Sequence, residues 1–208
     1  MSLFGNKVFL AGLIGRINPN LKPTGYYFFH PDVMVRATNK MASATKNLSV
    51  FSTNELPDIS HQRFAILVSE WNSDVTEALF AGAYQTLIQH GAKEENLVRG
   101  NVPGSYELTL GALWFAQRDD VDAVIALGCV IQGETKHNDY INHAVAQGLT
   151  NVSLKTGKPV IFGVLTPNDQ QQALDRAGGK HGNKGDEAAI TAIKMLGLQK
   201  QVYSFQFK

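Results

Sequence analysis

Short runs of apolar residues alternate along the chain with longer stretches in which apolar residues recur at every third or fourth position. The clearest run is Val124–Ile131, which is continuous, contains branched side chains and carries no charge. This pattern is typical of a strand that is buried on both faces of a sheet. Further runs predict strands at Phe64–Val68, at Pro159–Leu165 and, more weakly, at Glu95–Val102.

The stretches between these runs predict helices. The first has Ser73 or Asp74 as its candidate N-cap and ends at His90–Gly91. Others are expected to begin at Ser105–Glu107, near His137 and after Asp169, and a last helix contains Ala188, Ala189, Ile190, Ile193 and Leu196. This alternation predicts an α/β fold, namely a single three-layer αβα domain with a four-stranded parallel sheet, flavodoxin-like in architecture.

Residues 1–55 show neither the helical nor the strand pattern of apolar residues. We expect them to form a largely irregular N-terminal extension that is disordered in part. We expect the α/β domain to span residues 56–200 and a C-terminal tail to follow at 201–208. The apolar run Val8–Gly15 is too short to cross a bilayer, and unsuitable residues stand where a signal peptidase would cut. A further hypothesis is that translation begins at Met34 or Met41, which native peptides from residues 1 to 30 would rule out.

The composition is that of an ordinary globular protein. The 208 residues carry a formal net charge of +1, with 44% hydrophobic and 18% charged residues. No long basic run indicates nucleic-acid binding, and no segment indicates a membrane partner. Cys129 is the only cysteine, which excludes an intramolecular disulfide and favours a cytoplasmic location. Because it lies in an apolar run, we interpret it as a small buried side chain rather than a reactive thiol.

The turns after the predicted strands carry the candidate chemistry. In a parallel sheet these turns meet at one edge, where ligands bind. Trp71, Glu107 and His137 would supply an aromatic platform, a carboxylate and an imidazole that moves protons near neutral pH. Each also has a simpler interpretation, with Trp71 as a packing residue, Glu107 as a partner of a helix dipole and His137 as a surface cap. Their gathering at one edge favours a site.

Several well-known motifs are missing from the sequence. There is no GxGxxG, Walker loop, HExxH, GxSxG elbow or paired-cysteine site, so no nucleotide-binding loop, hydrolase nucleophile or metal site is predicted. The segment Arg176–Gly185 is expected to be a glycine-rich loop that carries Arg176, Lys180 and Lys184. Such a loop could hold a phosphate, or it could be a solvated basic turn.

Four segments together resemble the lumazine synthase family, whose members catalyse the penultimate step of riboflavin biosynthesis. They are Val102–Glu107, Gly128–His137, Pro159–Gly163 and Arg176–Gly185, and the resemblance covers residues from about 63 to 198. It implies the condensation of 5-amino-6-(D-ribitylamino)uracil with 3,4-dihydroxy-2-butanone 4-phosphate. The implied products are 6,7-dimethyl-8-ribityllumazine, phosphate and water, with neither a metal nor an organic cofactor.

The resemblance also implies roles for individual residues. His137 matches the catalytic proton donor, Arg176 the phosphate-binding arginine and Trp71 the aromatic residue that stacks on the pyrimidine. The other residues implied in substrate binding are Ser105, Tyr106, Glu107, Cys129, Val130, Ile131, Glu134, Thr135, Phe162 and Lys180. Two positions depart from the family pattern, since Asp175 stands where many relatives have Glu and Gln132 where a basic residue is frequent.

In the family, each site lies between neighbouring subunits of a pentamer, so Phe162, Arg176 and His137 need not meet Trp71 within one chain. The implied partners are two small-molecule substrates and further copies of this chain, either as a pentamer or as a shell of twelve pentamers, with riboflavin synthase as a candidate companion. The compact loop at residues 178–185 resembles that of shell-forming members and favours the shell. Two alternatives stay open, a non-catalytic shell-forming or flavin-binding protein and a flavodoxin-like binding module.

Overall fold

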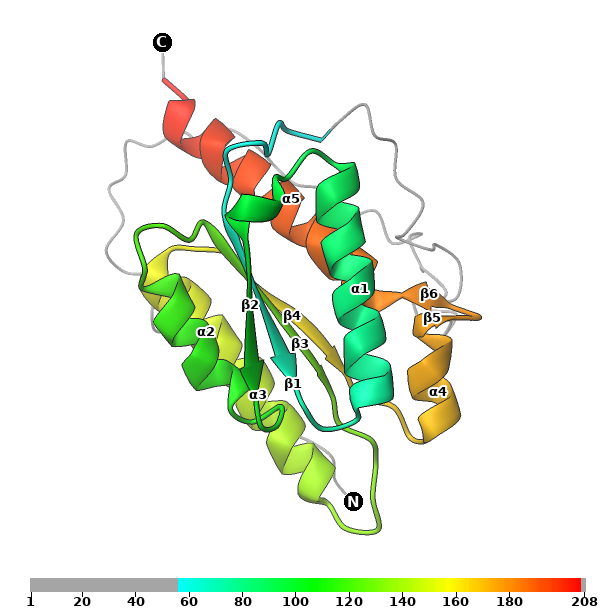
Figure 1. The fold of residues 1–208 in the computed structure, drawn as a ribbon. Coiled ribbons are helices and arrows are strands. Elements are labelled where there is room, and N and C mark those ends of the chain that lie inside the picture. Colours follow the sequence, from blue (N-terminus) through cyan, green and yellow to red (C-terminus); the bar gives the residue numbers. More distant parts are fainter. Residues whose placement is uncertain (1–55, 207–208) are drawn as a thin grey trace, which may run out of the picture. The chain divides into compact units, whose positions relative to one another are not determined.

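The apolar runs form the parallel sheet that the sequence predicts (Figure 1). The computed structural model describes residues 56–206, so the expected N-terminal extension and the alternative start sites lie outside the described part of the chain. The strands of the sheet are β1 (Phe64–Ser69), β2 (Leu97–Val102), β3 (Ala123–Cys129) and β4 (Val160–Leu165). They lie in the order β2-β1-β3-β4, and each neighbouring pair is parallel. The predicted α/β fold class is confirmed.

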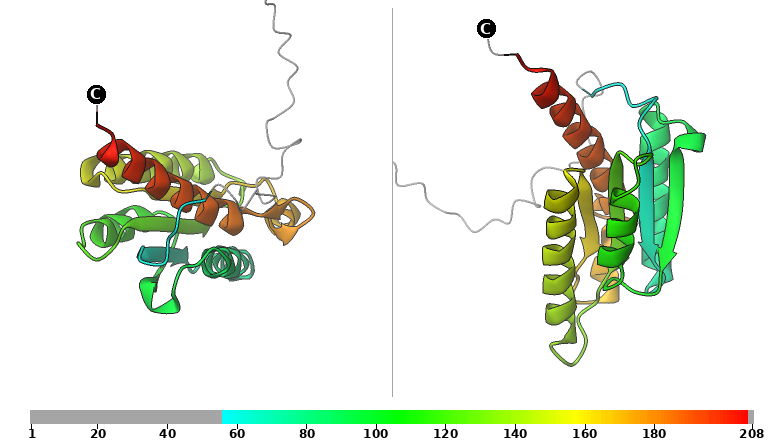
Figure 2. Two further views of the ribbon diagram at one scale, coloured as in Figure 1. Left: turned by 90° about the horizontal axis from the view of Figure 1, so that it is seen from above. Right: turned by 90° about the vertical axis from the view of Figure 1, so that its left-hand side faces the viewer.

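Helices cover both faces of this sheet (Figures 1 and 2). On one face lie α1 (Ser73–Gln89) and α5 (Lys184–Ser204), and on the other lie α2 (Leu108–Ala116) and α3 (His137–Thr156). The short helix α4 (Gln170–Asp175) follows β4. The domain therefore has the expected three layers, with the sheet in the middle.

The strands divide their side chains between two hydrophobic cores. In β1, Phe64, Ile66 and Val68 belong to the core under α1 and α5, whereas Ala65 and Leu67 belong to the core under α2 and α3. This follows from the two-residue period of a strand. Every residue of β1 and of β3 is buried. Burial on both faces explains why the sequences of these strands are continuous apolar runs and do not alternate between apolar and polar residues.

Several element boundaries differ from those expected. β2 begins at Leu97, because Glu94–Asn96 form a 3-10 helix. α2 begins at Leu108, because Ser105–Glu107 form a turn before it. α5 continues to Ser204, so the first residues of the expected C-terminal tail are helical.

The glycine-rich segment after α4 is a hairpin, and the prediction of an irregular loop is wrong. β5 (Ala177–Gly179) pairs antiparallel with β6 (Gly182–Asn183). Gly178 has a φ of 107°, a conformation that glycine adopts without steric cost. Asn183 joins the hairpin to α1, since its Nδ2 donates to the carbonyl oxygen of Ala78 at 2.8 Å. The segment is thus a defined part of the fold beside α1.

Helices α1 and α5 are in close contact at Gly185, where a Cβ atom would overlap the carbonyl oxygen of Leu79. We therefore expect Gly185→Ala to destabilise the protein by about 1–3 kcal/mol, a usual cost of forcing additional atoms into a packed interface. Thermal unfolding at a fixed protein concentration measures the change. Gly133→Ala is the matched control, because nothing lies within 4 Å of its added Cβ. Equal Tm values for the two variants would contradict this prediction.

Candidate functional site

The carboxyl ends of the parallel strands lie at one edge of the sheet. From β1 the chain crosses to β2 on one side, and from β3 it crosses to β4 on the other, so the direction of winding reverses between β1 and β3. Ligands of open α/β sheets bind outside the strand ends at such a reversal. The turns that follow β1, β2 and β3 therefore surround the position where a site is expected.

Trp71 and Glu107 lie close together at this edge. Trp71 follows β1 and is 73% exposed, so within this chain it is not a packing residue of the core. A Cβ atom placed on Gly104 would lie 3.1 Å from Glu107 Oε2 and 3.4 Å from Trp71 Cδ1. Glu107 stands at the N-cap position of α2, but its side chain does not cap that helix. An exposed indole and a carboxylate thus border the space that Gly104 leaves empty.

Ser105 lies deeper at the same edge. It is 6% exposed, and its Oγ lies 3.5 Å from Oγ of Ser69 at the end of β1. A Cβ atom on Gly128 would lie 2.6 Å from the same Ser105 oxygen. The Ser105 hydroxyl is therefore held where β1, β3 and the turn after β2 meet. Its neighbour Tyr106 is exposed.

The chain after Cys129 continues in extended form beside the end of β4. The Val130 N–H donates to the carbonyl oxygen of Leu165 at 2.9 Å, and the Gln132 N–H donates to that of Pro167 at 3.0 Å. Burial raises the pKa of the Cys129 thiol to about 11. The interpretation of Cys129 as a small buried side chain is confirmed. What this segment can offer a ligand is its backbone.

Asn72 also belongs to the candidate site, although nothing in the sequence indicated its contact there. Its φ of 59° and ψ of 48° are left-handed, and it occupies the N-cap position of α1. The prediction that Ser73 or Asp74 caps this helix is wrong, because the helix already begins at Ser73. The Asn72 side chain does not cap it either, since Nδ2 donates to the carbonyl oxygen of Cys129 at 2.9 Å. An Asn before a helix is ordinarily interpreted as a cap, and no local pattern indicates this long-range bond.

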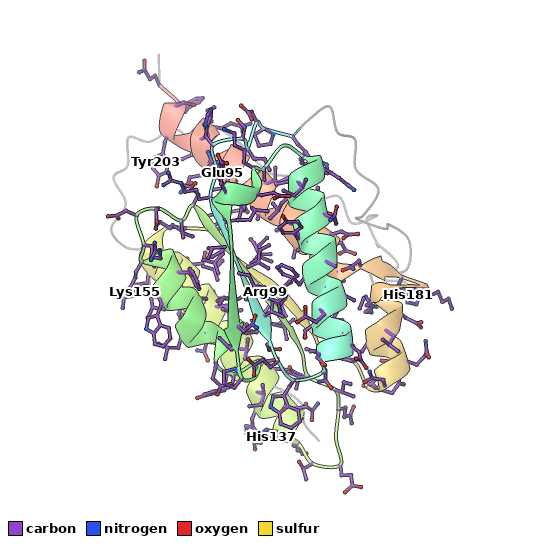
Figure 3. All side chains as sticks on the ribbon, viewed as in Figure 1. Glu95, Arg99, His137, Lys155, His181 and Tyr203 are labelled. Carbon is purple, nitrogen blue, oxygen red and sulfur yellow. The ribbon has the colours of Figure 1, made fainter. Side chains whose placement is uncertain are left out.

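His137 begins α3 at the same end of the sheet as the strand tips (Figures 1 and 3). The preceding turn is exposed and contains Glu134 and Thr135. The His137 N–H donates a long hydrogen bond to Thr135 Oγ1 at 3.4 Å, and the N-cap residue Lys136 contributes no side-chain cap. The helix start is exposed, so its partial positive charge is accessible to an anion.

Three further candidate residues lie outside this gathering, namely Arg176, Lys180 and Phe162. Arg176 directly follows α4, Lys180 is exposed between β5 and β6, and Phe162 in β4 is 43% exposed. The β5–β6 hairpin and α4 lie on the flank opposite α2 and α3 (Figures 1 and 2), and Figure 3 places His181, next to Lys180, at this hairpin. Within residues 56–206, Trp71 gathers with Ser105, Glu107 and Cys129, and no side-chain bond joins Arg176 or Lys180 to these residues.

Open α/β proteins bind small molecules at such an edge, and this one carries an exposed indole, a carboxylate and an exposed helix start. The profile of the 6,7-dimethyl-8-ribityllumazine synthase family matches residues 61–200 of the chain. The chain belongs to this family, whose members are transferases of riboflavin biosynthesis. The predicted resemblance is confirmed.

Individual relatives are similar over most of their own length. The 6,7-dimethyl-8-ribityllumazine synthase of Cytophaga hutchinsonii is 60% identical over 156 residues, which cover 75% of this chain and 98% of the relative. The enzyme of that name from Parabacteroides distasonis is 53% identical over 156 residues, with the same coverage of 75% and 98%. That of Flavobacterium johnsoniae is 51% identical over 161 residues, which cover 77% of this chain and 85% of the relative.

Within residues 56–206, no helix is long and apolar enough to span a bilayer. In the same part of the chain, no group of three or more His, Cys, Asp or Glu side chains is arranged to hold a metal ion.

The buried Cys129 thiol should be nearly inert in the native protein. The thiolate is the species that attacks a disulfide reagent, and a pKa raised from 9.0 to about 11 lowers the thiolate fraction at pH 8 by about 100-fold. We expect native protein to react with a disulfide reagent at least about 100-fold more slowly than protein unfolded in urea. The released chromophore reports both rates. Equal rates in the two states would contradict the burial of this side chain.

Proposed function

We propose that the chain condenses 5-amino-6-(D-ribitylamino)uracil with 3,4-dihydroxy-2-butanone 4-phosphate to give 6,7-dimethyl-8-ribityllumazine, phosphate and water. Residues 56–200 would form the catalytic domain, with residues 1–55 and 201–208 as an extension and a tail outside it. The observation that carries this proposal is the placement of Trp71 and Glu107 about Gly104 at the reversal of a sheet whose domain matches the family.

The pyrimidine substrate would occupy the first group of residues. Its ring stacks on the exposed face of Trp71, and its edge bonds to the backbone of Cys129, Val130 and Ile131. In an extended chain the N–H and C=O groups of successive residues point to opposite sides, and the N–H groups of Val130 and Gln132 are bonded toward the end of β4 and the chain after it. The N–H and C=O groups of Ile131 would then face the side of Trp71, where the pyrimidine edge would lie. The ribityl chain would bind Ser105, Tyr106 and Glu107, whose hydroxyl and carboxylate oxygens suit sugar hydroxyls.

The phosphate of the second substrate would be held by the turn before α3 and by cations. Glu134 and Thr135 belong to this turn, and the helix start favours negative charge. Arg176 and Lys180 supply full positive charge, which stabilises phosphate as it leaves. Phe162 would contact the substrate beside them. Since Arg176 and Lys180 lie on the other flank of the chain, a neighbouring copy would bring them to Trp71.

His137 would transfer the protons that imine formation, phosphate elimination and ring closure require. Much of the acceleration would come from holding two substrates in a reactive orientation. The Asp175 that replaces a frequent Glu accepts a hydrogen bond from Nε2 of Gln171 at 2.9 Å. This bond ties one carboxylate oxygen of Asp175 to α4.

Activity should depend on His137 and Arg176 in different ways. In an assay that mixes both substrates and follows lumazine fluorescence, we expect His137→Ala to lower kcat about 100-fold without abolishing turnover, because substrate orientation remains. Arg176→Ala should raise the KM for the butanone phosphate about 10- to 100-fold and change the KM for the pyrimidine little, because a charge-assisted bond to phosphate is lost.

Two matched variants control for these substitutions. His143 lies in α3 like His137, and Arg118 forms an ion pair with Asp120 away from the strand ends. His143→Ala and Arg118→Ala should therefore retain activity. Wild-type protein without enzyme-dependent product would overturn the proposed function and favour the non-catalytic alternative. A His137→Ala protein with no residual turnover would contradict the assigned role of His137.

We further propose that the chain acts in the cytoplasm as a symmetric homo-oligomer built from pentamers, with riboflavin synthase as a candidate companion. Closed symmetry is general among homo-oligomers. The phosphate-binding cations Arg176 and Lys180 belong to the segment of α4 and the β5–β6 hairpin, apart from the turns that carry the other proposed contacts, which supports a site shared between copies. The short β5–β6 hairpin, without an insertion, supports the shell of twelve pentamers.

Sedimentation of purified protein tests the assembly. We expect a particle of the size of twelve pentamers, because the compact hairpin leaves room for pentamers to pack together. Gly185→Ala, whose fold is expected to be less stable, is sedimented for comparison. It shows what particle size a weakened fold produces, so that this defect can be told from a defect of assembly. A wild-type particle no larger than a pentamer would contradict the proposed shell.

A further inference from the structure

Strands β1 and β3 separate where the site lies. Their pairing ends at Val68 and Leu127, although β3 stays paired with β4 as far as Cys129 and Leu165. The separation follows from the connections, because α1 leaves β1 toward one face of the sheet and α3 leaves β3 toward the other. Past the last pair, the backbones no longer hold the two turns at a fixed distance.

The Asn72 side chain joins the two turns again. Its Nδ2 donates to the carbonyl oxygen of Cys129 at 2.9 Å across the reversal of the sheet. Asn72 directly follows Trp71, and Cys129 directly precedes Val130. One hydrogen bond therefore connects the segment that carries the aromatic platform to the segment proposed to bind the pyrimidine edge.

The local structure around Asn72 is unfavourable by itself. Within residues 56–206, Asn72 is the one residue other than glycine with a positive φ, and its side chain gives no cap to α1. Asn is the non-glycine residue that adopts this conformation most readily. Residues held in unusual backbone conformations occur preferentially at functional sites. At this position the conformation directs the amide toward β3.

We propose that Asn72 is a positioning residue that sets the distance and angle between the Trp71 indole and the backbone of Val130 and Ile131, and thereby the affinity for the pyrimidine substrate. This inference rests on the proposed function. The alternative is that the bond only stabilises the fold. Asn96 offers the comparison, since its Nδ2 also donates to a backbone carbonyl, that of Ser60, at 3.1 Å. Both bonds are partly buried, but Asn96 and Ser60 lie at the amino ends of β2 and β1.

The variants separate the hydrogen bond from the backbone conformation. Asn72→Gly keeps the left-handed conformation and removes the amide. Asn72→Asp keeps the size and this conformation, but an ionised carboxylate cannot donate to the Cys129 carbonyl. For both we expect the KM for the pyrimidine to rise about tenfold, while the KM for the butanone phosphate changes less than twofold. Loss of one orienting hydrogen bond has this order of effect.

A binding measurement without turnover gives the second readout. In a Trp114→Phe background, the remaining tryptophan in the described domain is Trp71, so quenching of its fluorescence by the pyrimidine reports stacking directly. We expect Asn72→Gly and Asn72→Asp to weaken this binding about tenfold. Asn96→Ala should lower Tm about as much as Asn72→Gly and leave both KM values and the quenching unchanged.

Three results would overturn the positioning role. They are a pyrimidine KM within twofold of wild type in Asn72→Gly, a full rescue by Asn72→Asp, and an equal change of KM in Asn96→Ala. Inactive wild-type protein would instead overturn the proposed function, and the quenching titration would then still decide whether Asn72 orients Trp71 toward the pyrimidine.

Discussion

The divergence of β1 and β3 at their carboxyl ends is the constraint on which the site depends. Two helices that cover opposite faces cannot both follow adjacent strands without leaving space between their connecting turns. In this chain Gly104 lies between Trp71 and Glu107 at this edge, and the absence of a side chain on Gly128 lets Ser105 pack against the end of β3. The connections between the strands therefore determine where the candidate site lies, and the side chains of the turns determine what it can bind.

The two hydrophobic cores supply the rigidity that such a space requires. β1 and β3 contribute residues to both cores, so a shift of either strand end would disturb packing on both faces of the sheet. The turns themselves have less support. Asn72 forgoes a side-chain cap, normally a gain of about 1 kcal/mol, and bonds to the end of β3 instead. Asn at an N-cap position normally caps its helix. That it does not do so at this one turn is better explained by a requirement of function than by a requirement of the fold.

Sequence reasoning was most successful where structure follows from local pattern. The continuous apolar runs predicted the strands of the parallel sheet, because burial on both faces leaves an unmistakable signal in the strand itself. It failed where contacts between residues far apart in the sequence determine the structure. The Arg176–Gly185 segment was expected to be a loop, yet its glycines and the bond from Asn183 to α1 make it a hairpin.

The candidate site shows the same division. Trp71, Glu107 and His137 could be found because turns after parallel strands must meet at one edge. Asn72 could not, because its partner Cys129 lies 57 residues away and an Asn before a helix has an ordinary local explanation. The separation of Arg176 from Trp71 within the chain also has no local signal, since it depends on which flank each connection follows.

The placement of Trp71 and Arg176 in different parts of one chain has a genetic consequence. If neighbouring copies complete each site, a chain altered at Trp71 still presents an intact Arg176 to the next copy, and the reverse holds for a chain altered at Arg176. Mixed assemblies of two inactive proteins would then contain some sites made of two unaltered halves. Inactivating alleles of this protein would accordingly fall into two complementation groups, divided by the half of the site that each one damages.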